Sequence, residues 1–132
     1  DDGPAVVAVT LLTSLSASDV EQVGGRSIPS LRGEVDRLAA LALACGLHGV
    51  VSSPLEVEAL RRRHGRDFVV VTPGVRSAAD APDDQARTAT AADAARAGAD
   101  YLVVGRPVHA AADPLAAVQA LRRELDPLEE SA

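Results

Sequence analysis

Short apolar runs alternate with longer amphipathic segments along the chain. Four runs, each followed by small or turn-forming residues, predict buried strands over residues 5–12, 49–51, 68–71 and 101–104. Segments with the helical spacing of apolar positions follow them, over residues 31–45, 54–63, 91–97 and 114–125. The order of strand and then helix, four times over, predicts a parallel α/β sheet with right-handed crossovers.

Capping residues support these boundaries independently of the apolar pattern. Ser53 followed by Pro54 is typical of a helix start. Gly46, Gly65 and Gly98 each follow a helical segment and precede a strand by three residues, where a left-handed residue is expected. Around these glycines, "CGLHGVVSSP", "HGRDFVVVTPG" and "AGADYLVVGRPV" form a weak internal repeat. The repeated unit is one strand with its following helix.

The remaining segments are expected to be irregular, and the whole chain is expected to form one domain. A short helical turn should begin near Ser16, followed by a loop over residues 23–33, and residues 127–132 should form a frayed tail. The 132 residues are too few for a complete eight-stranded α/β barrel, which typically needs about 200 or more.

Composition narrows the class of protein. The chain is 47% hydrophobic and 24% charged, which is typical of a globular domain and not of a disordered one. A net charge of −6 with scattered arginines argues against nucleic acid, which selects a basic face. No 18-residue apolar run or signal peptide is visible, and the single Cys45 cannot form an internal disulfide, so the cytoplasm is the expected compartment. Cys45 is expected to be a small buried residue.

Polar residues and glycine follow the predicted strands. They are Thr13 and Ser14 after the first, Ser52 and Ser53 after the second, Arg76 after the third, and Gly105 with Arg106 after the fourth. A guanidinium fork suits phosphate oxygens, and glycine lets a ligand approach the backbone closely. The residues therefore predict a phosphomonoester site. The three histidines are expected elsewhere: His48 and His64 in structural roles at helix ends, and His109 in a loop.

A family resemblance becomes specific at these motifs. The stretches "AVTLLTSL", "LALACGLHGVVSSP", "FVVVTPGVR", "DDQARTAT" and "AGADYLVVGRPV" resemble consecutive blocks of bacterial orotidine 5′-phosphate decarboxylase, in order and over nearly the whole chain. The resemblance implies a parallel (βα)4 half of a TIM barrel, corresponding to strands five to eight of the family barrel. It also implies an enzyme of pyrimidine biosynthesis, usually a homodimer, that converts orotidine 5′-phosphate (OMP) to uridine 5′-monophosphate (UMP) with neither metal nor organic cofactor.

The resemblance also implies roles for individual residues. Thr13 would lie beside the pyrimidine or its ribose, with the adjacent Ser14 ranked below it. Arg76 and Gln85 would belong to a loop that closes over the substrate, with Gln85 reaching the phosphate. Gly105 and Arg106 would hold the phosphate through a backbone N–H and a guanidinium group.

The resemblance does not extend to the residues that catalyse the family's reaction. The family's catalytic array, Lys…Asp-x-Lys-x-x-Asp, lies on earlier strands, and this chain has 13 arginines and no lysine. We therefore expect no catalytic residue in this chain and no activity from it alone. Asp83 stands where the family usually has glycine, and with Asp84 it would repel a phosphate dianion unless both carboxylates point outward.

Two other functions stay open. One is half of a related barrel enzyme acting on a sugar phosphate, against which the spacing of Gln85 argues; the other is a non-catalytic scaffold or interaction fragment. An isolated half-barrel would expose two sheet edges and one apolar face, so we expect it to associate with itself or with a complementary N-terminal half.

Overall fold

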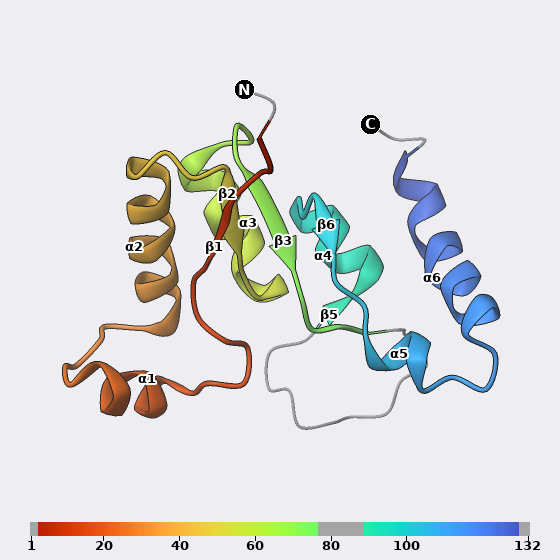
Figure 1. Cartoon of the computed structure of the whole chain (residues 1–132), viewed down its shortest axis with the longest axis horizontal. Helices are drawn as coiled ribbons and strands as arrows, with labels where there is room; N and C mark the ends of the chain where they lie inside the picture. The colour runs from red at the N-terminus through yellow and green to blue at the C-terminus, as the bar shows by residue number, and fades with distance from the viewer. Residues whose placement is uncertain (1–2, 77–88, 130–132) are drawn as a thin grey trace.

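The fold is a parallel sheet with helices packed on one of its faces (Figure 1). The structure, a computed structural model, describes residues 3–76 and 89–129. The strands are β1 (Val7–Val9), β2 (Gly49–Val51), β3 (Val69–Thr72), β4 (Val75–Arg76), β5 (Ala89–Thr90) and β6 (Tyr101–Leu102). The helices are α1 (Ala17–Gly24), α2 (Leu31–Ala44), α3 (Pro54–His64), α4 (Ala91–Ala97), α5 (Arg106–His109) and α6 (Pro114–Glu129).

The main sheet has four strands in the order β1-β2-β3-β6, and every neighbouring pair is parallel. Val9, Val51, Val71 and Tyr101 are register partners from strand to strand, so they form one row across the sheet. The strands β4 and β5 form a separate parallel pair. The predicted parallel α/β architecture, with four strand-and-helix units, is confirmed.

Several boundaries differ from those predicted. The first strand is confined to Val7–Val9 within the expected 5–12, because the chain turns away from β2 after Thr10. The helix α1 extends to Gly24, which limits the expected loop over 23–33 to residues 25–30. The helix α6 continues to Glu129, beyond residue 127, where the tail was expected to begin.

The core lies between the sheet and its helices. Val50 and Val70, from the two central strands, are completely buried in this core. The side chains packed around them are aliphatic or small, with one aromatic ring: Val35, Ala39, Ala42, Val57, Leu60 and Phe68. A second cluster of Val75, Ala91, Ala94 and Leu121 joins α4 and α6 to the strand β4. The core is thus built from Ala, Val and Leu, as the composition requires.

Glycine is required where two backbones approach closely. A Cβ atom added to Gly49 at the start of β2 would overlap the backbone carbonyl of Val69 on β3. Gly98, which ends α4 with φ of 103°, occupies a conformation that other residues rarely adopt. Gly46, Gly65 and Gly98 all have positive φ, as predicted for helix ends, but Gly65 has ψ of −154° and so lies outside the left-handed helical region.

A buried arginine joins the helices to the amino ends of the strands. Arg61 on α3 donates to the carbonyl oxygens of Gly98 and Phe68, at 2.8 and 2.7 Å, and forms an ion pair with Asp100. Asp100 Oδ2 also accepts from the N–H of Val70 at 2.7 Å. The Arg61 side chain is only 7% exposed. This network therefore stabilises the end of the sheet opposite to the predicted site.

The cysteine and the three histidines lie at or near the ends of helices and strands. Cys45 is exposed, contrary to the sequence expectation, because it caps α2 beyond the last buried position of that helix. His48 Nδ1 accepts from the N–H of Val6, and His64 Nε2 lies 2.8 Å from Asp36 Oδ1. His109 ends the short helix α5 instead of lying in a loop. None of the helices in the described ranges has the length and hydropathy needed to cross a membrane.

Candidate functional site

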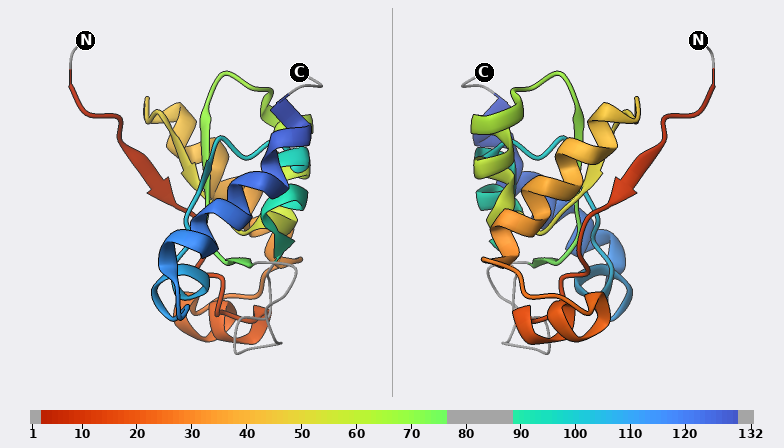
Figure 2. Two further views of the ribbon diagram at one scale, coloured as in Figure 1. Left: turned by 90° about the vertical axis from the view of Figure 1, so that its right-hand side faces the viewer. Right: turned by 90° about the vertical axis from the view of Figure 1, so that its left-hand side faces the viewer.

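The carboxyl ends of the four parallel strands lie at one end of the molecule, which we call the rim (Figure 1). The helices α1 and α5 and the pair β4–β5 lie at this same end in every view (Figure 2). Loops that leave the carboxyl ends of parallel strands form the binding sites of α/β folds. The rim is therefore where the predicted site residues should be sought.

Arg76 reaches the rim from β3. After Thr72 the chain turns at Gly74, whose φ is 75°, and Val75 is buried against α4. Arg76 then pairs in register with Thr90, the residue that caps α4 through a hydrogen bond from the N–H of Asp93. The backbone of Arg76 is thus held between the sheet and the start of a helix.

Gly105 and Arg106 reach the rim from the neighbouring strand β6. The N–H of Val103 donates to the carbonyl of Thr72 at 2.9 Å, so the two strand exits run side by side. Gly105 precedes α5, and its carbonyl accepts from the N–H groups of Val108 and His109. A Cβ atom at Gly105 would meet no atom within 4 Å. Open space therefore lies beside this backbone, and the exposed Arg106 follows at the start of α5.

Thr13 lies at the same end but on the other side of the sheet. Thr10 closes β1 by donating its N–H and its hydroxyl to the carbonyl of Val51, and Thr13 follows in the next turn. Two strands separate β1 from β6, so the two exits are about 14 Å apart along a flat sheet, less if the sheet curves. One ligand could contact both only with two separate binding groups. Gln85 lies outside the described residues.

The serines after β2 do not face the rim. Ser52 and Ser53 are each 1% exposed, and Ser53 Oγ accepts from the N–H of Leu55 to cap α3. Ser52 Oγ and Thr72 Oγ1 are buried without a hydrogen-bond partner among the described residues. Thr10 and Thr72, the buried threonines at the ends of β1 and β3, were not among the residues predicted at the strand ends. Each ends an apolar run of the sequence, and that position could have indicated them.

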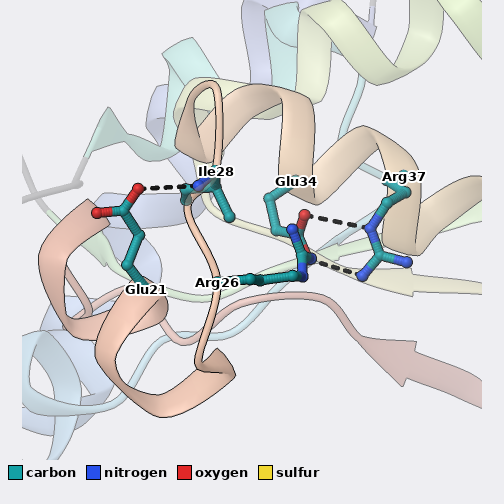
Figure 3. A network of polar contacts seen from close by, with 5 residues as sticks. All are labelled: Glu21, Arg26, Ile28, Glu34 and Arg37. Atoms are coloured by element: carbon teal, nitrogen blue, oxygen red, sulfur yellow. Dashed lines mark hydrogen bonds and ion pairs between the residues drawn. The ribbon is translucent and has the colours of Figure 1, made fainter.

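An ion-pair network holds the connection between α1 and α2 (Figure 3). Glu34, in the first turn of α2, accepts from Arg37 and from Arg26 of the preceding loop. Hydrogen bonds from Arg37 and then from Arg26 lower the pKa of Glu34 to about 2. Glu21 on α1 accepts from the N–H of Ile28 at 2.8 Å. These contacts stabilise the segment that follows Thr13.

The two predicted arginines give the rim groups that suit an anion. Arg76, Arg106 and backbone N–H groups are of the kind that bind phosphate oxygens. Nowhere in residues 3–76 and 89–129 do three or more His, Cys, Asp or Glu side chains gather as a metal site would require.

Comparison with known proteins gives a consistent result. A profile of the orotidine 5′-phosphate decarboxylase / HUMPS family matches residues 1–121. The chain is 50% identical over 122 residues to the orotidine 5′-phosphate decarboxylase of Chromobacterium violaceum, covering 92% of this chain and 49% of the relative. It is 51% identical over 120 residues to the orotidine 5′-phosphate decarboxylase of Nitrosomonas europaea, covering 91% of this chain and 51% of the relative.

A solved structure agrees. The fold matches the crystal structure of orotidine 5′-phosphate decarboxylase from Lactobacillus acidophilus with a TM-score of 0.74 and 39% sequence identity, covering 92% of this chain and 49% of that one. The chain thus spans about half the length of the relatives it matches, as the half-barrel prediction requires. This chain belongs to the orotidine 5′-phosphate decarboxylase / HUMPS family.

Proposed function

We propose that this chain is the phosphate- and pyrimidine-binding half of an orotidine 5′-phosphate decarboxylase, with OMP as substrate and UMP as product. The observation that carries the proposal is that Arg76 and Gly105–Arg106 lie on the segments that leave the adjacent strands β3 and β6, in a member of this family. Arginine forks and a free backbone approach suit a phosphate dianion.

In this proposal, residues on two sides of the rim bind different parts of the nucleotide. Gly105 and Arg106 bind the phosphate, and Arg76 and Gln85 belong to the loop that covers it. Thr13, across the sheet, contacts the pyrimidine or its ribose. The separation of the two strand exits supports this division, because a nucleotide carries its phosphate and its base at opposite ends. Cytoplasmic location, inferred from the single Cys45, is part of the same proposal.

The binding role is tested with Arg106, whose side chain is exposed and can be changed without disturbing the core. Arg106→Ala should weaken UMP binding about 10- to 100-fold, because charge-assisted hydrogen bonds to the phosphate are lost. Arg66→Ala is the matched control, since Arg66 is also exposed but lies in the turn before β3, away from the rim. Calorimetric titration of UMP into the three proteins measures this. Equal affinity of all three would contradict the assignment of Arg106.

Binding and chemistry should be separable in this chain. In the family reaction, as the resemblance implies, a lysine protonates C6 as carbon dioxide leaves, and this chain contains no lysine. Phosphate contacts supply remote binding energy that is expressed in the transition state, but they do not supply the proton. We therefore expect no decarboxylation of OMP by the purified chain, measured by the change in ultraviolet absorbance on conversion to UMP. A measurable rate that follows the protein through purification would refute this.

The scaffold alternative makes a different prediction. A fragment with a vestigial site should bind neither UMP nor inorganic phosphate, and Arg106→Ala should then change nothing. The same titrations therefore distinguish the two functions.

A further inference from the structure

Arg76 lies on a strand of only two residues, β4, whose position depends on a second two-residue strand. Within the described sheets β4 pairs with β5 alone, and Arg76 is the register partner of Thr90. A pair of strands this short is not stable in isolation. A further element must therefore hold the pair, and Arg76 with it, in place.

Thr90 joins the strand pair to a helix. It is both the last residue of β5 and the N-cap of α4, with an extended backbone of φ −69° and ψ 161°. Its Oγ1 accepts from the N–H of Asp93 at 3.1 Å and donates to Asp93 Oδ2 at 2.8 Å. Arg96 donates to the other oxygen of the same carboxylate at 2.9 Å. The Thr90 side chain therefore fixes the start of α4 to the strand that pairs with Arg76.

The helix α4 is itself firmly packed. Ala91 and Ala94, from its first turn, are buried in one cluster with Leu121 of α6. Val75, the residue before Arg76, is buried in the same cluster. The helix thus supports β4 through packing at Val75, and through the cap and the backbone of Thr90 at Arg76.

The guanidinium group of Arg76 depends closely on where its backbone lies. Arg76 is half-buried and its Nη2 atom is inaccessible to solvent, whereas Arg106 is exposed. A partly enclosed side chain has little freedom to compensate for a displaced backbone. Charge-assisted hydrogen bonds weaken steeply when their geometry is lost. A small shift of the Arg76 backbone should therefore be felt at the phosphate.

We propose that Thr90 is the positioning residue for Arg76, because its cap of α4 sets where the Arg76 guanidinium group meets the phosphate. Thr90 acts through Arg76 and does not itself contact the ligand. The identity of the ligand rests on the proposed function, whereas the support of Arg76 by Thr90 is a property of the chain without ligand.

Calorimetric titration of UMP and of uridine tests the effect on the ligand. Thr90→Val keeps the shape of the side chain and removes its hydroxyl, so it should weaken UMP binding about 10-fold and uridine binding less than about twofold. Thr90→Ser keeps the hydroxyl and should retain UMP affinity within about twofold. With Arg76→Ala already present, Thr90→Val should cause no further loss. A similar loss for uridine, for Thr90→Ser, or in the presence of Arg76→Ala would overturn the proposal.

Ser30→Ala is the control that separates positioning from a general loss of stability. Ser30 caps α2 by accepting from the N–H of Gly33 at 3.0 Å, and α2 packs on β1 and β2 instead of β4. Both Ser30→Ala and Thr90→Val should lower the melting temperature by about 3–5 °C, because each removes one helix cap. Only Thr90→Val should weaken UMP binding. Equal weakening by Ser30→Ala would overturn the proposal.

Amide hydrogen exchange without ligand separates the failure of this proposal from the failure of the proposed function. In Thr90→Val the amides of Val75 and Arg76 should exchange about fivefold faster than in the unmodified chain, whereas that of Val50 should change no more than in Ser30→Ala. If the unmodified chain binds no UMP, the proposed function fails, and the exchange alone decides whether Thr90 holds Arg76. Unchanged exchange at Val75 and Arg76 would overturn the positioning role whatever the affinity for UMP.

Discussion

Arginine side chains serve two purposes in this chain, which has no lysine. Arg61 is buried at the amino ends of the strands, where it donates to two backbone carbonyls and to Asp100. It also lies over the ring of Phe68, 5.0 Å from the ring centre, as a cation on an aromatic face does. Arg106, in contrast, is exposed at the rim, where a ligand can reach it.

Replacing Arg61 tests the structural purpose. Arg61→Met should lower the free energy of unfolding by about 2–3 kcal/mol, because the carbonyls of Gly98 and Phe68 lose a donor and Asp100 loses its cation. Arg62→Met is the matched control. Arg62 pairs with Glu58 on the exposed face of the same helix, so its loss should cost about 1 kcal/mol or less. Urea unfolding followed by circular dichroism measures both, and similar costs would show that the Arg61 network contributes little.

Single-residue environments were only partly predictable. The positive φ of Gly46, Gly65 and Gly98 followed from their position after helical segments. The pairing of Arg61 with Asp100 did not, because 39 residues separate them and nothing local links them. The burial of Ser52 was missed for a similar reason. A side chain just past a strand end can turn toward the helices or toward the rim, and only packing decides which.

At the scale of elements, the connection from β1 to α2 depends on a carboxylate at a helix start. Glu34 joins Arg26 in the loop to Arg37 one turn along α2, and its pKa is lowered to about 2 from an ordinary 4.5. A lowered carboxyl pKa stabilises the fold fully above the ordinary value. That contribution is lost as the pH falls from about 4.5 toward 2.

Glu34→Gln should remove this pH dependence. At about pH 7 the variant should be less stable than the unmodified chain by about 1–3 kcal/mol, because hydrogen bonds to a charged group are weakened. The difference should shrink as the pH falls from 4.5 toward 2. Urea unfolding at several pH values measures it, with Glu58→Gln as the control at an exposed pair. A difference that is the same at every pH would contradict the role of Glu34. Hydrogen bonds from Ser16 also lower the pKa of Asp19. Stability that depends on Asp19 is therefore lost at low pH in the unmodified chain and in Glu34→Gln alike.

Elements marked by an apolar run or by helical spacing were predictable, and elements without such a mark were not. Strand 49–51 and helix 91–97 match the expected bounds, because apolar runs and capping residues coincide there. The strands β4 and β5 have two residues each, and α5 has four, so none is long enough to show a period in the sequence. Two of these three carry predicted site residues: Arg76 ends β4, and Arg106 begins α5.

At the scale of the whole molecule, the chain is half of a barrel, with helices of the described ranges packed on one face of its sheet. The order of strands and helices predicts the parallel sheet, and the motifs predict that Arg76, Gly105 and Arg106 meet at one rim. How Gln85 sits relative to them lies outside the described residues. In the function proposed above the half-barrel binds a phosphate, and the sequence contains no lysine that could belong to the family array. Nucleotide binding without turnover is therefore the property that we expect of this chain.

Calorimetric comparison of UMP with uridine on the unmodified chain tests this property most directly, because the two ligands differ only in the phosphate. We expect UMP to bind, and uridine to bind at least about tenfold more weakly, because in the proposed site the arginines contact the phosphate. Equal affinity for UMP and uridine, or no binding of UMP, would contradict it.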